Sequence, residues 1–264
     1  MRFVTATLIV LCLAVVPAAA DVQLKFNDSH SGDTTLISVK DGMVRMETGD
    51  GLSLYNVAGD TIAVADRNDK TYFRMNRAEL KSRMSQMQGM MSQMQAQLRE
   101  RLKDLPADQR RMVEQQMGGL LAAQAPQRQA SKPDLRATGS EQEVAGYRCR
   151  QYTLGQSGQK IKEFCVASRK TLGMSEKDFS ALSSLFSFLG DMAASARSLD
   201  GDDTDMTELG ALADMGGVPV QTHNLQSGKN SRLLSVSTSA LSAELFRMPD
   251  GYQARDPFGS MPAR

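Results

Sequence analysis

The sequence predicts an α+β protein, in which a curved antiparallel β-sheet forms a half-open barrel that helices cover. Three observations lead to this fold class. Short alternating segments with tight turns fill residues 34–75, helical periodicity runs over about residues 76–124, and alternating segments return after residue 140. The middle stretch is therefore predicted to be a helical insert between two parts of one sheet, followed by a linker over about 125–140.

The first alternating stretch predicts a five-stranded meander from Thr34 to Met75, after a first strand over residues 21–27. Turn residues occur at Asp41-Gly42, Gly49-Asp50, Gly59-Asp60 and Asn68-Asp69. If each is a two-residue hairpin, the facing pairs are Ile37 with Met46, Val39 with Val44, Val44 with Tyr55, Tyr55 with Val64, Val57 with Ile62, Val64 with Phe73 and Ile62 with Met75. All four turns place apolar residues on one face, which a one-residue slip would scatter.

The insert predicts a helical hairpin. Apolar residues recur at spacings of three and four along its first helix: Leu80, Met84, Met87, Met91, Met94, Leu98, Leu102 and Leu105. Pro106 then suits the first turn of a second helix, to about Ala123. The stripe of that second helix consists of Met112, Val113, Met117, Leu120 and Leu121.

Seven of the 17 methionines lie between Met84 and Met117, which leaves three interpretations open. They are plain packing, since Met fills irregular gaps, a cover over an adaptable hydrophobic groove, or a Cu(I) site made of soft thioethers. No His or Cys joins the cluster, and the methionines fit the packing stripe. We therefore expect no metal site and no cofactor.

The first twenty residues predict a secretory signal peptide. Arg2 gives a positive start, residues 8–16 an apolar core, and Ala18-Ala19-Ala20 a cleavage site. Cleavage after Ala20 leaves a single domain over 21–264, with 30 basic and 30 acidic residues. Zero net charge argues against a nucleic-acid partner, and no later segment is long and apolar enough to span a membrane. We expect a periplasmic protein.

Two cysteines remain after cleavage, Cys149 and Cys165. Residues 141–167 predict a hairpin with a loop at 156–158, and that register places the two cysteines directly opposite each other. Export favours a disulfide between them. A catalytic thiol is the alternative, but no C-x-x-C motif and no nearby His supports it.

The remaining chain predicts one amphipathic helix and a return to strands. Ser175 and Asp178 suit a helix start, and the apolar stripe that follows contains Phe179, Leu182, Phe186, Leu189, Ala193 and Ala196. Residues 218–225 and 232–238 predict strands, residues 243–248 a short extended piece, and residues 249–264 a loose tail.

Sequence motifs give no reason to expect an enzyme. The chain lacks G-x-S-x-G, H-E-x-x-H, P-loop and G-x-G-x-x-G patterns. Its two histidines, His30 and His223, fall near predicted loops or strand ends. We therefore expect no catalytic residues.

Six segments resemble a bacterial family of exported proteins, domain of unknown function 4412. They are VKDGMVRME (39–47), DKTYFRM (69–75), VAGYRCRQYTL (144–154), KEFCVAS (162–168), GVPVQT (217–222) and LFRMPDGY (245–252). That family is similar to the LolA-like superfamily of periplasmic lipoprotein carriers. The resemblance implies a half-open barrel whose helices cover an apolar concave face that binds acyl chains.

We therefore expect a non-enzymatic protein that binds a lipid, an acyl chain or a lipidated protein in a helix-covered groove. The groove candidates are Ile37, Val39, Val44, Met46, Tyr55, Val57, Ile62, Val64, Phe73, Met75, Met84, Met87, Met91, Met94, Phe179, Leu182, Phe186 and Leu189. The alternative is an envelope structural or interaction protein with a filled core, whose methionine-rich hairpin binds a partner.

Overall fold

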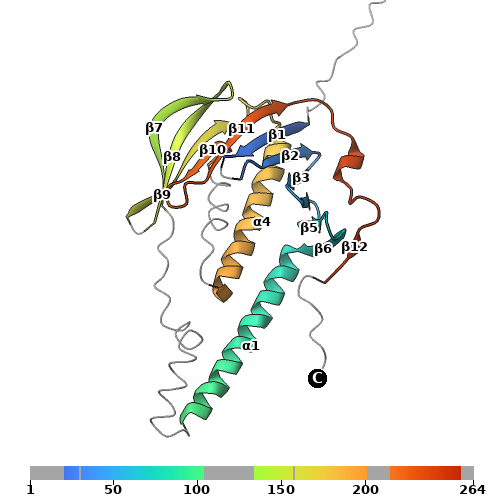
Figure 1. The fold of residues 1–264 in the computed structure, drawn as a ribbon, viewed down its shortest axis with the longest axis vertical. Helices are drawn as coiled ribbons and strands as arrows, with labels where there is room; N and C mark the ends of the chain where they lie inside the picture. Colours follow the sequence, from blue (N-terminus) through green and yellow to red (C-terminus); the bar gives the residue numbers. More distant parts are fainter. Residues whose placement is uncertain (1–20, 30, 104–133, 157, 201–214, 257–264) are drawn as a thin grey trace, which may run out of the picture.

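The computed structural model describes residues 21–29, 31–103, 134–156, 158–200 and 215–256. These residues form a large open β-sheet of twelve strands in the order β12-β6-β5-β4-β3-β2-β1-β11-β10-β9-β8-β7, together with two long helices (Figure 1). All neighbouring strands are antiparallel except β12 and β6. The strands are β1 (Val22–Asp28), β2 (Thr34–Lys40), β3 (Met43–Thr48), β4 (Gly51–Asn56), β5 (Thr61–Asp66), β6 (Thr71–Asn76), β7 (Asp134–Val144), β8 (Tyr147–Gln156), β9 (Gln159–Ser168), β10 (Gly217–Asn224), β11 (Asn230–Ser237) and β12 (Gln253–Ala254). The helices are α1 (Arg77–Lys103), α4 (Glu176–Asp200) and the short 3-10 helix η1 (Ala243–Phe246).

Strands β2 to β6 confirm the five-stranded meander. Ile37 faces Met46, Val44 faces Tyr55 and Ile62 faces Met75, as the turn residues predict. At the first turn, Asp41 and Gly42 both have positive φ values, of 52° and 81°. Such backbone is what a tight hairpin with the twist of its flanking strands requires.

The predicted register of the third turn is wrong. Tyr55 faces Ile62 instead of Val64, because residues 57–60 form a four-residue loop in place of a two-residue turn. The loop is closed by the Asp60 N–H donating to the Val57 carbonyl (3.1 Å), and the Asn56 side chain accepts from the Ala58 N–H (2.9 Å). The shift is two residues, so every apolar side chain keeps its face. Val57 itself leaves the sheet and is 36% exposed.

Strand β1 joins the two parts of the sheet. It pairs with β2 on one side and with β11 on the other, so the beginning of the chain lies between the meander and the strands β7 to β11. Its residues Val22, Leu24 and Phe26 alternate into the core. The predicted first strand is therefore confirmed, and it occupies the middle of the sheet.

The disulfide between Cys149 and Cys165 is present, but the register that predicts it is wrong. Cys149 faces Ala167, and Cys165 faces Gln151. The hairpin closes with Gln156 opposite Gln159, which shifts the predicted register by one residue. A bulge after Leu154 shifts it by one more. The two cysteines are thus diagonal neighbours on one face, with their Cα atoms 5.4 Å apart.

Part of the predicted linker is a strand. Residues 134–140 belong to β7, which pairs only with β8 and ends the sheet. An edge strand tolerates polar residues, because one of its sides needs no partner. Gly139, at a φ of 79°, lies in a bulge between Ala137 and Glu141, where the Thr138 hydroxyl donates to the Gln151 carbonyl (3.2 Å). The rest of the linker, 125–133, lies outside the described residues.

Helix α4 supplies most of the core that covers the meander. It begins after Ser175, whose hydroxyl accepts from the Asp178 N–H (3.1 Å) and donates to the Asp178 carboxylate (2.6 Å). This satisfies the helix start as a capping box does. Ala181, Leu182, Leu185, Phe188 and Leu189 are all buried against the apolar face of the sheet.

Helix α1 confirms the first half of the insert. It follows β6 directly and packs against β6 and α4. The predicted second helix, Pro106–Ala123, lies outside the described residues, as does Leu105; the side chains of Leu98 and Leu102 are also not described.

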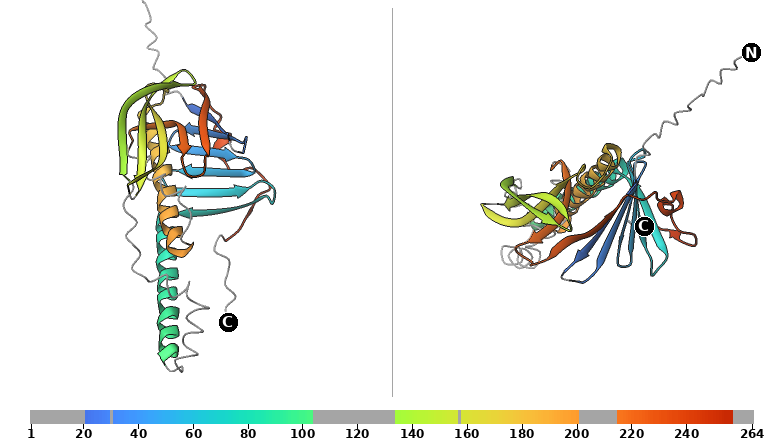
Figure 2. Two further views of the ribbon diagram at one scale, coloured as in Figure 1. Left: turned by 60° about the vertical axis from the view of Figure 1, so that its left-hand side comes forward. Right: turned by 90° about the horizontal axis from the view of Figure 1, so that it is seen from above.

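The predicted loose tail is wrong as far as residue 254. Tyr252 and Met248 pack against Leu52, Leu54, Ala63, Ala65 and Tyr72, on the face of the meander opposite the helices. Gln253 and Ala254 then pair with β6. Residues 243–246 form η1 instead of an extended piece, and Arg45 holds it by donating to the Leu245 carbonyl (2.8 Å). Figure 2 shows this segment on one side of the meander and the helices on the other.

Removing the disulfide is expected to weaken the fold without changing it. The variant Cys149→Ala with Cys165→Ala loses a cross-link of sequence separation 16, and its free energy of unfolding is expected to fall by about 3 kcal/mol. Urea unfolding of the wild type and the variant measures the difference. Reductant serves as the control, since it is expected to weaken only the wild type. Equal unfolding midpoints for the two proteins would contradict the prediction.

Candidate functional site

The predicted groove residues come together on the helix-covered face of the sheet. Fifteen of the eighteen belong to, or pack against, one hydrophobic cluster. Buried in it are Ile37, Val39, Val44, Tyr55, Ile62, Met75, Met84, Leu182 and Leu189. Half-buried against it are Met46, Val64, Phe73, Met87, Phe179 and Phe186. The three that do not join it are Val57, Met91 and Met94.

Several central members of the cluster escaped the sequence prediction. Leu185 and Phe188 are 1% and 0% exposed, and the Phe188 ring lies 5.8 Å from that of Tyr55. A signal for them exists, since Ala181, Leu185 and Phe188 follow each other at helical spacings of four and three. The buried stripe of α4 is therefore wider than the predicted one.

The two helices cover this face unequally. Helix α4 contributes six buried apolar residues among those described, whereas α1 contributes Leu80 and Met84 alone. Beyond Met84 the cover of α1 loosens: Met87 and Met91 are half-buried, and Met90 and Met94 are 57% and 51% exposed. Both ribbon views show α1 running past the end of α4 and away from the sheet (Figures 1 and 2). Along the seam between α1 and strands β5 and β6, the apolar side chains Val64, Phe73 and Met87 are therefore only partly covered.

Arg77 fixes the base of α1. Its guanidinium pairs with Asp60 at the β4–β5 loop (2.8 Å) and with Asp191 of α4. It also lies over the Phe188 ring, 5.1 Å from its centroid, which is a favourable cation–π distance. The Tyr55 hydroxyl donates to the same Asp60 carboxylate (2.7 Å). One arginine therefore joins the meander, α1 and α4.

The surroundings of this junction stabilise the ionised carboxylate of Asp60 and the neutral hydroxyl of Tyr55. Burial raises the pKa of Tyr55 to about 12, and the Asp60 carboxylate that accepts a hydrogen bond from its hydroxyl adds to the effect. Burial pushes the pKa of Asp60 upward, but the hydrogen bonds from Arg77 and Tyr55 outweigh it, so that pKa lies below 3.8. Asp60 is thus anionic and Tyr55 neutral over the whole physiological range.

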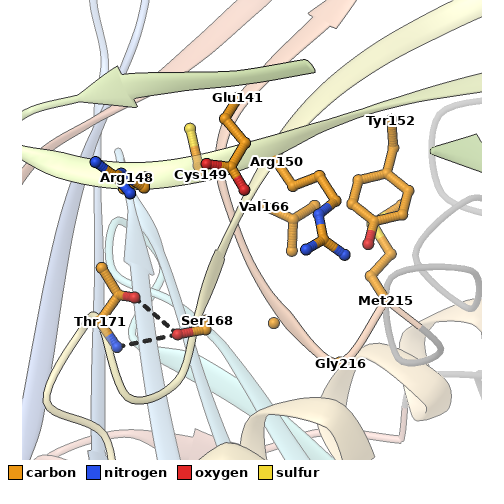
Figure 3. Close-up of a pocket in the computed structure, with 11 residues that line it drawn as sticks. Glu141, Arg148, Cys149, Arg150, Tyr152, Val166, Ser168, Thr171, Met215 and Gly216 are labelled. Atoms are coloured by element: carbon orange, nitrogen blue, oxygen red, sulfur yellow. Dashed lines mark hydrogen bonds between the residues drawn. The ribbon is translucent and has the colours of Figure 1, made fainter. Parts of the chain in front are cut away.

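A pocket of about 290 Å³ opens beside strands β7 to β9 (Figure 3). Arg148 and Arg150 line it and have no ion-pair or hydrogen-bond partner within the ranges that the structure describes. In the β7–β8 register, however, Glu143 and Glu141 stand opposite these two arginines. Glu141 also lines the pocket, and opposite charges across a strand pair offset each other, so most of the positive charge of the two arginines is balanced.

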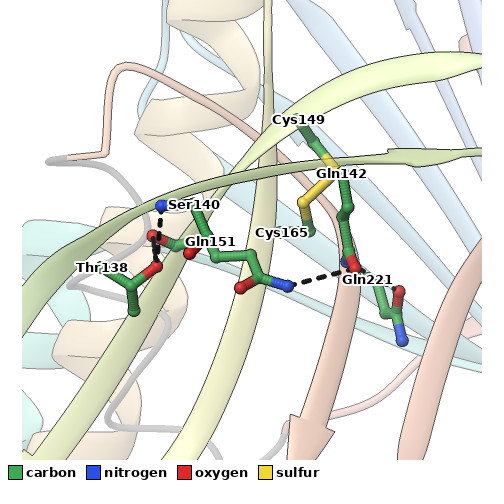
Figure 4. The surroundings of a disulfide bond; sticks show 7 residues. All are labelled: Thr138, Ser140, Gln142, Cys149, Gln151, Cys165 and Gln221. Carbon is green, nitrogen blue, oxygen red and sulfur yellow. Dashed lines mark hydrogen bonds between the residues drawn. A yellow bond between two sulfur atoms is a disulfide. The ribbon is translucent and has the colours of Figure 1, made fainter.

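A second pocket, of about 280 Å³, lies on the disulfide-bearing face of strands β7 to β10. Gln142, Gln151 and Gln221 line it around Cys165 and are linked by hydrogen bonds (Figure 4). None of these glutamines is a predicted site residue. The sequence carries no signal for them, because two bulges and the pairing order of the strands decide that they meet.

Comparison with known proteins places the chain in a family. Residues 62–252 match the domain of unknown function DUF4412. The chain belongs to this family. In this DUF4412 protein the match covers the last two strands of the meander, both long helices and strands β7 to β11. No curated protein matches the chain.

Solved structures are similar to the DUF4412 chain only distantly. PNGF-II matches with a TM-score of 0.40 and 8% identity, over 91% of this chain and 32% of that chain. The MucA/MucB complex of Pseudomonas aeruginosa matches with a TM-score of 0.34 and 16% identity, over 86% and 55%, and MucB with 0.32 and 15%, over 89% and 59%. The chain thus spans between about a third and three fifths of the proteins it matches. No helix within the described ranges is long and apolar enough to cross a membrane.

The junction at Arg77 predicts a loss of stability in alkali. A tyrosine whose pKa is raised from 10.0 to about 12 on folding stabilises the protein fully below pH 10, and this contribution is lost as the pH rises toward 12. Tyr55→Phe is therefore expected to unfold more easily at neutral pH, by about 1 kcal/mol, and to lose less stability than the wild type above pH 10. Urea unfolding across this pH range measures both effects, with Tyr147→Phe as the control. Parallel curves for wild type and Tyr55→Phe would refute the prediction.

Proposed function

We propose that this DUF4412 protein is a non-enzymatic periplasmic binding protein for an apolar ligand. The ligand class is a lipid, an acyl chain or the lipid-modified end of a protein. In this proposal the bound ligand lies between the apolar face of the meander and the helices that cover it. The proposal extends to the fold: a half-open barrel of the lipoprotein-carrier kind, with a methionine-rich helical hairpin formed by α1 and residues 106–123.

The observation that carries the proposal is the seam along α1. Val64, Phe73 and Met87 are half-buried there, while their neighbours Ile62, Met75 and Met84 are buried. In this proposal a ligand binds along the seam and completes the burial of these three side chains. Each methylene group that a ligand buries there contributes about 0.8 kcal/mol, so an acyl chain gains affinity with length.

The side chains of α1 suit a cover that yields to such a ligand. Methionine is unbranched and flexible, so it refills irregular gaps at low cost. The helix is held firmly at its base by Arg77 and Leu80, and more weakly from Met87 onward. A ligand that enters along the seam displaces methionine side chains and leaves the packing of α4 intact.

A second candidate function rests on the projecting part of α1. Residues 84–98 contain no charged residue, and Met90 and Met94 are more than half exposed there. A helix with an exposed apolar stripe is one of the recurring forms of partner recognition. Under this second function the protein's own side chains fill the core, and the protein is an interaction protein of the cell envelope.

The first test is native mass spectrometry of protein purified from the periplasm without detergent, followed by extraction and identification of lipids. We expect a stoichiometric acyl-bearing molecule. The variant Phe73→Gln with Met87→Gln, which makes the seam polar, is expected to reduce its retention about tenfold.

The matched control for this test is Met90→Gln with Met94→Gln on the projecting part of the same helix. It is expected to keep the lipid, because neither methionine packs against the core cluster. A lipid-free wild type that takes up no added phospholipid would exclude the apolar-ligand function. The interaction function then predicts a protein partner that the control variant no longer binds.

A further inference from the structure

The pocket beside the disulfide is a polar site that the apolar-ligand function does not use. We propose that it binds a short neutral saccharide, one or two sugar rings long. The inference rests on four features of the pocket, which are the origin of its glutamines, their hydrogen bonding, the charge of its rim, and the rigidity of its base.

Strand pairing places three glutamines around one disulfide. Gln142 on β7 stands opposite Cys149, while Gln151 on β8 and Gln221 on β10 stand on either side of Cys165. Directly paired residues point to the same face of a sheet, so all three side chains share the face of the disulfide. Figure 4 shows the glutamine side chains gathered beside it.

The glutamines form a chain with two free ends. Gln151 Nε2 donates to Gln142 Oε1 (3.1 Å), and Gln142 Nε2 donates to Gln221 Oε1 (3.2 Å). The hydrogen bond between Gln142 and Gln221 joins β7 to β10, which are three positions apart in the strand order. The sheet therefore curls around the pocket. Within the described residues, Gln151 Oε1 has no donor and Gln221 Nε2 has no acceptor. The chain therefore offers one acceptor and one donor to a ligand.

Further polar groups in the pocket lining add donors and acceptors without adding net charge. Thr153 and Glu163 face each other across β8 and β9, and His223 faces Glu163 from β10. Lys160 also lines the pocket, so its charge and that of Glu163 cancel. Hydroxyl, amide and imidazole groups each donate or accept. Vicinal hydroxyls of a sugar, each a donor and an acceptor, match such a lining.

The same features disfavour ligands of other classes. An anion would find a single cation, Lys160, and one carboxylate, Glu163, in the same lining. Tyr152 and Phe164 also border the pocket, but their side chains alternate to the opposite face, where they pack with Leu154 and Val166, so an apolar ligand would find few apolar groups. The volume of about 280 Å³ lies just below the range of typical ligand pockets, which is roughly 300–1,000 Å³. One or two sugar rings suit this size.

The base of the pocket is preorganised. Cys149 and Cys165 are 2% and 1% exposed, and their disulfide ties β8 to β9 directly beneath the glutamines. All three glutamines are half-buried and two of them are held by amide hydrogen bonds to Gln142. Side chains fixed before binding lose little conformational entropy when a ligand arrives.

Nitrogen–proton correlation NMR of the intact mature protein tests the proposal directly, because glutamine side-chain amides give their own signals. Cellobiose is the probe, with triglycine and glucose 6-phosphate as competing ligand classes. We expect cellobiose to shift the side-chain amide signals of Gln142, Gln151 and Gln221. Removing one hydrogen bond with Gln221→Ala is expected to weaken cellobiose binding about fivefold.

The matched control is Gln23→Ala, which removes a half-buried glutamine bonded to Ser38 on β2, away from the pocket. It is expected to bind cellobiose like the wild type. Thr153→Val, an isosteric change, is the second variant should Gln221→Ala fail to fold, and it is also expected to weaken binding. The proposal is overturned if cellobiose leaves the three amide signals unmoved, or if only triglycine or only the sugar phosphate moves them. Lipid content is a separate measurement, so this result stands apart from the fate of the apolar-ligand function.

Discussion

The structure depends above all on one requirement: the apolar face of the meander must be covered, and α4 covers it. Val39, Val44, Tyr55 and Ile62 are at most 2% exposed, and each lies in the cluster that α4 completes. Full burial of a large apolar side chain contributes about 1.5–3 kcal/mol, so a helix that buries four such residues, Leu182, Leu185, Phe188 and Leu189, accounts for much of the stability. The other elements follow from this packing. Helix α1 can project from the sheet because α4 already protects its centre.

Much of the fold is readable from the sequence, because tight turns fix register locally. Turn residues at 41–42, 49–50 and 68–69 give the observed pairing, and Ser175 with Asp178 gives the start of α4. The predicted register is wrong where an irregularity of the backbone sets the strand pairing. A four-residue loop at 57–60 shifts one register by two residues, and a shorter loop together with a bulge after Leu154 shifts the other by two. The residue types at these positions do not distinguish the loop and the bulge from simple two-residue turns, because the hydrogen bonds that close them form only in the folded backbone.

The two candidate sites differ in how far sequence predicts them. Periodicity identifies the apolar face, because each buried residue carries its own signal in the 2.0 or 3.6 repeat. The glutamine pocket carries none. Gln142 and Gln221 are 79 residues apart, and they meet because the sheet curls and β10 pairs with β9. Polar sites built from several strands depend on topology and bulges together, so they become visible only in the folded chain.

The segment that ends in β12 gives the sheet a second cover, on the face opposite the helices. Arg45 holds η1 through the Leu245 carbonyl, Met248 and Tyr252 cover an apolar patch on the meander, and Gln253 and Ala254 occupy the outer side of β6. An uncovered strand edge beside an apolar patch is a site at which chains adhere to one another. More than 160 positions of sequence separate this segment from β6. A chain in which β6 has formed and this segment has not yet docked therefore exposes an adhesive edge, and docking of the segment is the event that closes it.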